Sequence, residues 1–202
     1  MKVLFKWVFV FALMFSPLLG GCGEADTEST PEPEVDEHEE EPALGIHEAA
    51  SAGKANKVLA HLEAGEDVNA AGLLGSSPLH MAARGGQLEV AQLLIDHGAD
   101  LNARSDPGFT PLHAAAHGNH VEMAQLLIDN GAEVNAQDLH GFSSLHRAAV
   151  YGNTEVSKVL LENNADVNLE DKDGATAFEV AVRGGHPEMA DLLREHGAVD
   201  SL

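Results

Sequence analysis

The chain has 202 residues and a formal net charge of −22, because 33 acidic residues outnumber 11 Lys and Arg residues. Binding to nucleic acid requires a concentration of Lys and Arg that this composition lacks, so we expect no nucleic-acid partner. A protein partner held by charge is expected to present a basic surface.

Residues 1–21 have the order of a secretory signal peptide. Lys2 and Lys6 precede an apolar run from Trp7 to Phe15, and a Ser-Pro pair ends this run. A charged start, a short apolar middle and small residues at the end are typical of export signals. The run is too short to span a bilayer, which takes about 20 apolar residues.

The end of this leader, Leu19-Gly20-Gly21-Cys22, resembles the lipobox of bacterial lipoproteins. The resemblance implies cleavage before Cys22 and attachment of lipid to it. Cys22 is the single cysteine, so no disulfide within the chain is possible. We therefore expect a lipid-anchored protein of the cell envelope, with simple secretion as the alternative. Gly23 stands where, in Gram-negative bacteria, Asp would resemble an inner-membrane retention signal. In a Gram-negative host the sequence therefore favours the outer membrane facing the periplasm.

Residues 22–42 are predicted to form a disordered tether that follows the lipidated cysteine. From Glu24 to Pro42 the chain holds ten acidic residues and three prolines, and Val35 is its one large apolar residue. Such a segment has too little apolar surface to offset its ordering entropy, and its own charge extends it. The alternative is an acidic tail that binds cations or a partner, with His38 as its distinctive residue.

Residues 43–202 repeat with a period of 33. Ser77-Pro78-Leu79-His80, Thr110-Pro111-Leu112-His113 and Ser143-Ser144-Leu145-His146 are spaced by this interval, as are Gly75, Gly108, Gly141 and Gly174. A unit of this size cannot bury its apolar face alone, so neighbouring units must stack into a solenoid. The period divides the segment into five units, residues 43–72, 73–105, 106–138, 139–171 and 172–202.

Each unit has the pattern of two helices followed by a projecting turn. In the third unit Thr110 can cap a helix through its hydroxyl, and Pro111 suits the first helical position. Met123, Leu126 and Leu127 then have the spacing of a buried helical stripe. The sequence therefore predicts an all-α solenoid of about five helix pairs.

The third unit also carries a family resemblance. Gly-Phe-Thr-Pro-Leu-His-Ala-Ala-Ala at residues 108–116, followed by residues 121–135, resembles an ankyrin repeat. The resemblance implies an ankyrin-repeat solenoid with projecting hairpin loops, in which one histidine per unit ties the turn to the helix by hydrogen bonds. The histidines at this position are His47, His80, His113 and His146.

Several residues depart from the family pattern. The first unit lacks the Thr-Pro start, and the last has Ala177 in place of Pro and Glu179 in place of His. Both units are terminal, where repeat arrays need polar capping faces. Gly72 and Ser105 stand where the family usually has Asp, so the turns between the first three units are expected to be held less firmly.

The twelve histidines raise the alternative of a metal site. His113 and His117 lie four residues apart on one predicted helical face, but the family assigns His113 to the fold. A calcium loop at residues 171–174 fails, because Leu169 and Val180 stand where ligands are needed. No catalytic motif is present, so we expect a non-enzymatic protein with no cofactor, no metal and no small-molecule substrate.

The family resemblance implies protein binding on the concave face, which the turn tips and first helices form. The variable positions of that face predict a binding surface of eleven residues: Leu73, Leu74, Met81, Arg84, Phe109, His117, Leu139, His140, Phe142, Arg147 and Tyr151. Aromatic and Arg side chains dominate binding energy at interfaces. The alternative for Phe109 and Phe142 is that each packs within its own turn.

These features predict a membrane-anchored, non-enzymatic module whose concave face holds a periplasmic or envelope protein. One alternative is an inhibitor or immunity-type protein that blocks a basic toxin or enzyme. A second alternative is a metal-handling lipoprotein that uses the acidic tether and the histidines.

Overall fold

The computed structural model describes residues 44–199, which contain ten α-helices and one 3₁₀ turn. The elements are α1 (Ile46–Ser51), α2 (Ala55–Glu63), η1 (Leu73–Gly75), α3 (Pro78–Gly85), α4 (Leu88–Asp96), α5 (Pro111–His117), α6 (Val121–Asp129), α7 (Ser144–Tyr151), α8 (Thr154–Glu162), α9 (Ala177–Gly184) and α10 (Pro187–Glu195). The predicted signal peptide, Cys22 and the tether lie outside the described residues.

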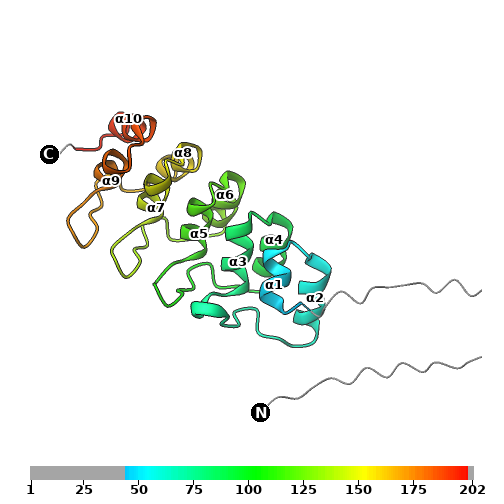
Figure 1. Cartoon of the computed structure of the whole chain (residues 1–202). Helices are drawn as coiled ribbons and strands as arrows, with labels where there is room; N and C mark the ends of the chain where they lie inside the picture. Colours follow the sequence, from blue (N-terminus) through cyan, green and yellow to red (C-terminus); the bar gives the residue numbers. More distant parts are fainter. Residues whose placement is uncertain (1–43, 200–202) are drawn as a thin grey trace, which may run out of the picture. The chain divides into compact units, whose positions relative to one another are not determined.

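The helices form two rows (Figure 1). Helices α1, α3, α5, α7 and α9 contact one another in sequence and form the inner row, while α2, α4, α6, α8 and α10 form the outer row. Each inner helix also packs on the outer helix that follows it, so each of the five predicted units holds one helix pair. Extended pairing within residues 44–199 is limited to an isolated bridge between Glu170 and Thr176. The prediction of an all-α solenoid is confirmed.

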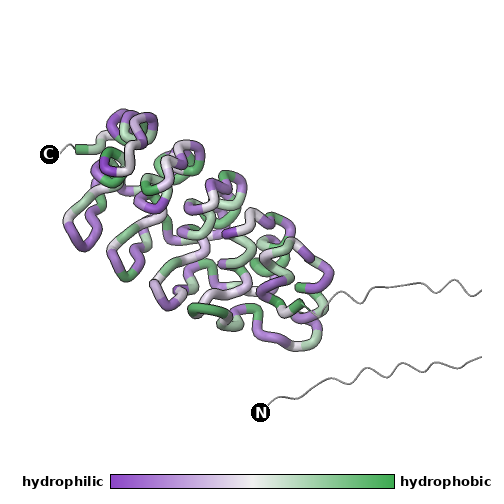
Figure 2. The backbone as a smooth tube through the Cα atoms, viewed as in Figure 1, coloured by the Kyte–Doolittle hydropathy of each residue, from purple (hydrophilic) through white to green (hydrophobic). Residues whose placement is uncertain are grey.

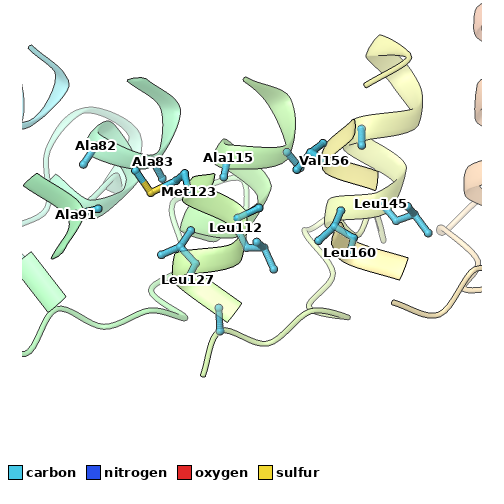
Figure 3. Close-up of a cluster of buried hydrophobic side chains, with 14 of the residues drawn as sticks. Ala82, Ala83, Ala91, Leu112, Ala115, Met123, Leu127, Leu145, Val156 and Leu160 are labelled. Atoms are coloured by element: carbon cyan, nitrogen blue, oxygen red, sulfur yellow. The ribbon is translucent and has the colours of Figure 1, made fainter. Parts of the chain in front are cut away.

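The core is continuous from the first helix pair to the last. Small residues line the contacts between inner helices, since Ala82, Ala83, Ala115 and Ala116 are fully buried, and this allows the helices to approach closely. Larger side chains fill the space between the rows, as Leu112 shows (Figure 3). Apolar stretches concentrate where helices meet, whereas the projecting turns mix polar and apolar stretches (Figure 2). The compact unit Glu40–Leu202 thus has its own core and is expected to fold without the preceding residues.

Reciprocal caps begin α3, α5, α7 and α9, and in α3, α5 and α7 the capping histidine also connects the helix to the next turn. In α5, His113 Nδ1 accepts a hydrogen bond from the backbone N–H of Thr110, at 3.2 Å. Its Nε2–H donates to the carbonyl oxygen of Phe142 in the following turn, at 2.9 Å. His80 and His146 make the same pair of contacts, and His47 donates to the carbonyl of Ala70. Each of these rings is therefore a structural link between units.

The last unit keeps the cap with a different side chain. Glu179 stands at the histidine position, and its carboxylate accepts a hydrogen bond from the N–H of Thr176 at 2.9 Å. The carboxylate thus takes the acceptor role that Nδ1 of the histidine has in α3, α5 and α7.

The turns differ in how many side-chain hydrogen bonds hold them. Asp138 Oδ1 accepts from two backbone N–H groups, and Asp171 Oδ1 does the same in the next turn. Ser105 Oγ accepts one, from Phe109 at 3.2 Å. Gly72 has no side chain to contribute. The substitutions at residues 72 and 105 thus remove part of the side-chain bonding, in the direction that the sequence predicts.

Ser144 offers a direct test of the helix starts. It occupies the first position of α7, is fully buried, and its hydroxyl has no hydrogen-bond partner among residues 44–199. Pro78 and Pro111 fill the equivalent positions of α3 and α5, and Ser143 already has the extended ψ of 173° that a residue before proline requires. Ser144→Pro is therefore expected to stabilise the domain by about 0.4–1 kcal/mol, measured by chemical denaturation. An unchanged or lower stability would contradict the assigned helix start.

Candidate functional site

The inner face carries a groove, called here the central groove, across the second to fourth units. It has a volume of about 200 Å³ and is lined by Ser76, His80, Met81, Arg84, Ser105, Phe109, His113, Ala114, His117 and Arg147. These residues come from α3, α5, α7 and the turns before α3 and α5. The middle units therefore supply one continuous surface.

Arg147 organises the floor of the central groove. Its guanidinium carbon lies 4.2 Å from the ring centroid of Phe109 and 5.0 Å from that of Phe142. These rings stack in turn on His113 and His146, with centroids 6.0 and 5.5 Å apart. The result is a ladder of five side chains that runs from α5 to α7. Cation–π contacts of this kind stabilise by about 0.5–2 kcal/mol.

A buried carboxylate fixes the position of Arg147. The Asp138 side chain is fully buried and forms an ion pair with the guanidinium. Burial alone would raise the pKa of Asp138, but hydrogen bonds from Arg147 and from the N–H groups of His140 and Phe142 hold this pKa below its usual value. Arg147 Nε is buried and has no hydrogen-bond partner among the described residues. Arg147 is thus mainly a connector between two units, and one edge of it faces the groove.

Phe109 and Phe142 pack inside the domain and are also partly exposed on its surface. Both rings are half-buried and stack on the histidine of their own unit, as the alternative interpretation predicts. Phe109 also lines the central groove. Met81 is half-buried beside it.

The remaining predicted binding residues are exposed. Leu73 is 84% exposed, Leu74 61%, Leu139 55% and Tyr151 48%, and Arg84, His117 and His140 are also exposed. Leu73, Leu74, Leu139 and His140 lie at the turn tips, where Asp106 N–H donates to Leu74, Leu139 N–H to Pro107, and Lys172 N–H to His140. Main-chain hydrogen bonds therefore hold the tips in register.

A second aromatic contact lies at the far end of the inner helices. The rings of His117 and Tyr151, at the ends of α5 and α7, meet edge to face with centroids 4.5 Å apart. Burial lowers the pKa of His117, and the charges of Arg84 and Arg147 lower it further. The imidazole of His117 is consequently neutral at pH 7. It lines the central groove together with Arg84.

The charge of the central groove differs from that of the chain. Although acidic residues outnumber basic ones three to one, none of the described residues that line the groove is acidic. Arg84 and Arg147 line it instead. The expectation of a basic partner, which rests on net charge, therefore has no support from the lining of this groove.

Neither a clustered set of metal ligands nor a membrane-spanning helix is found within residues 44–199. This part of the chain contains no group of three or more His, Cys, Asp or Glu side chains placed to hold a metal ion. His113, from the predicted pair with His117, uses both ring nitrogens for Thr110 and Phe142. None of the described helices combines the length and apolar character needed to cross a bilayer.

Sequence reasoning missed two features of the site. Asp138, which pairs with Arg147, is not among the residues that the repeat positions predict for the concave face. Ser105 was noted as a departure from the family pattern but also lines the groove.

The stacked helix pairs and the groove along their inner row define a solenoid of the kind that binds macromolecules on an extended surface. Two family models agree with this class: a model of three ankyrin repeats matches residues 46–138, and a model of many ankyrin repeats matches residues 127–181. Together the matches cover residues 46–181, more than half of the chain, so the chain belongs to the ankyrin-repeat family. No curated protein matches the sequence. Ankyrin repeats indicate a protein-interaction module.

Proposed function

We propose that the chain is a membrane-anchored, non-enzymatic module whose central groove holds a periplasmic or envelope protein. The proposal rests on one observation. Arg84 and Tyr151 are exposed on the middle units, beside the ladder of five stacked side chains that contains Arg147. Internal contacts fix the ladder in place, so little ordering entropy remains to be lost on binding. Exposed arginine and tyrosine beside such a platform are the residue types that dominate binding energy.

The anchor is proposed from the sequence. A charged start, a short apolar run and the lipobox-like Leu-Gly-Gly-Cys at residues 19–22 support lipid attachment at Cys22, with the outer membrane facing the periplasm as the location. The acidic tether would then hold the repeat domain away from the membrane, because like charges extend it.

Replacement of Cys22 tests the anchor. Cys22→Ser is expected to move the protein from the membrane fraction to the soluble fraction, or to leave an unprocessed precursor. Fractionation and sequencing of the N-terminus would show this. Identical partitioning and an identical N-terminus for wild type and variant would refute lipid attachment.

An inhibitor or immunity-type protein that blocks a basic toxin or enzyme is a second candidate. The net charge of −22 favours it, because a strong negative field accelerates association with a basic partner. A metal-handling role would depend on the tether, which lies outside the described residues, because the repeat histidines bond to backbone carbonyls.

Affinity capture tests the binding function. Immobilised residues 40–202 are expected to recover a stoichiometric protein from envelope extract, and Tyr151→Ala combined with Arg84→Ala is expected to lose it. Both side chains are exposed, so the double variant should keep its fold, which circular dichroism would verify. Equal recovery by wild type and variant would exclude the central groove as the site.

A further inference from the structure

The outer face of the array carries a second groove, formed by α4 and α6 with Val159 of α8 and called here the outer groove. Its volume is about 640 Å³, and Leu88, Val121, Leu126 and Val159 supply its apolar lining. Leu88 is 41% exposed, although its helix packs on the core through another face. The outer groove lies on the second helices and shares no lining residue with the central groove.

Carboxylates line the outer groove at repeated positions. Helices α4 and α6 have nearly the same sequence, so Glu89 and Glu122 are equivalent, as are Asp96 and Asp129. Glu89, Glu122 and Asp129 line the groove. Gln125 Nε2 donates to Asp129 at 2.7 Å, and the equivalent amide in α4 donates to Asp96 at 2.8 Å. These bonds hold the carboxylates along the helices.

Neither α4 nor α6 contains Lys, Arg or His. No Lys, Arg or His is among the described residues that line the outer groove. In the next outer helix, α8, Lys158 occupies the position that glutamine holds in α4 and α6, and it pairs with Glu155 at 2.7 Å. Glu155 therefore has a cation beside it, whereas three carboxylates and no basic side chain line the outer groove. Glu89 also borders a neighbouring hollow that Lys54 and Lys57 line.

We propose that the outer groove is a second docking surface, which takes a basic amphipathic segment of a partner protein. The apolar side of such a segment would cover Leu88, Val121 and Leu126, and its Lys or Arg side chains would face Glu89, Glu122 and Asp129. A second copy of this chain is disfavoured, because each copy carries a charge of −22. The central groove has no acidic lining, so the acidic character of the chain would act in binding on the outer row of helices.

A designed peptide tests the proposal on residues 40–202. The probe is a 14-residue helical peptide of Leu and Lys with its leucines on one face, and the comparison peptides are a scrambled sequence and a Leu-Glu version. The Leu-Lys peptide is expected to shift backbone NMR signals of α4 and α6. The scrambled and acidic peptides are expected to leave these signals in place.

Matched variants locate the contact. Glu122→Gln should weaken binding about two- to fivefold, the effect of one exposed ion pair. Glu188→Gln removes the same charge at the same repeat position of α10 and should leave affinity unchanged. Leu88→Ser should also weaken binding, whereas Tyr151→Ala beside the central groove should not. Equal effects of Glu122→Gln and Glu188→Gln, or signal changes confined to the central groove, would overturn this proposal without affecting the first.

Discussion

Replacing Leu112 by alanine is expected to lower the free energy of unfolding by about 2–5 kcal/mol. Leu112 is fully buried in the first turn of α5, which packs on α3, α6 and α7. Truncation would leave a cavity where three other helices meet, and the short, tightly capped helices have little freedom to close it. The energetic cost adds the lost burial of the side chain to the unfilled volume.

Two further variants provide stability changes with which that of Leu112→Ala can be compared. Leu139→Ala makes the same chemical change at a turn tip that is 55% exposed, and should alter stability by no more than about 0.5 kcal/mol. Thr110→Ala removes one helix cap and should cost about 0.5–2 kcal/mol. Chemical denaturation of residues 40–202 would rank the three. Similar shifts for Leu112→Ala and Leu139→Ala would mean that the core is not where the structure places it.

Acidification is expected to lower the free energy of unfolding through His113 by an amount comparable to that of Leu112→Ala. Burial lowers the pKa of His113 from 6.5 to about 4, and burial likewise lowers the pKa of His80 and of His146. The ring of His113 must stay neutral in the folded chain, because Nδ1 accepts a hydrogen bond from the N–H of Thr110. A proton on Nδ1 would remove this acceptor and face the N–H donor. The unfolded chain binds a proton below pH 6.5 and the folded chain does not. Stability is therefore complete above pH 6.5 and falls as the pH drops to 4, by about 3 kcal/mol for His113.

The origin of this loss can be separated from general acid unfolding. His113→Gln keeps an amide that can donate to the carbonyl of Phe142 but removes the titration. Denaturation curves at pH 7, 5.5 and 4.5 should show a shallower loss for His113→Gln than for wild type, whatever the variant's absolute stability. Parallel curves would show that His113 does not contribute to the pH dependence.

The fold could be predicted because its determinants are local and repeat. A hydroxyl residue followed by proline at residues 110–111 favours a helix start, and the recurrence of related signals along the chain predicts the stacking. The departure at Glu179 also follows from local chemistry, since Glu179 caps α9 as the histidines cap α3, α5 and α7.

The details of the site could not be predicted in the same way. Phe109, Phe142 and Arg147 were assigned to the concave face by their repeat positions, but periodicity does not show that the arginine inserts between the two rings and pairs with a buried aspartate. Net charge likewise does not show which face of the domain carries the acidic residues. Net charge sums over all faces, whereas Glu89, Glu122 and Asp129 lie at the outer groove and not at the central one.

The most direct test of the central claim is the affinity of a captured partner for surface variants of residues 40–202. Tyr151→Ala changes a residue that is 48% exposed and should weaken binding by about 2 kcal/mol or more if the residue is a hot spot. Lys158→Ala, on the exposed face of α8, is the control and should leave affinity within about 0.5 kcal/mol. Unchanged binding by Tyr151→Ala together with weakened binding by Lys158→Ala would place the partner on the outer helices and contradict the assignment to the central groove.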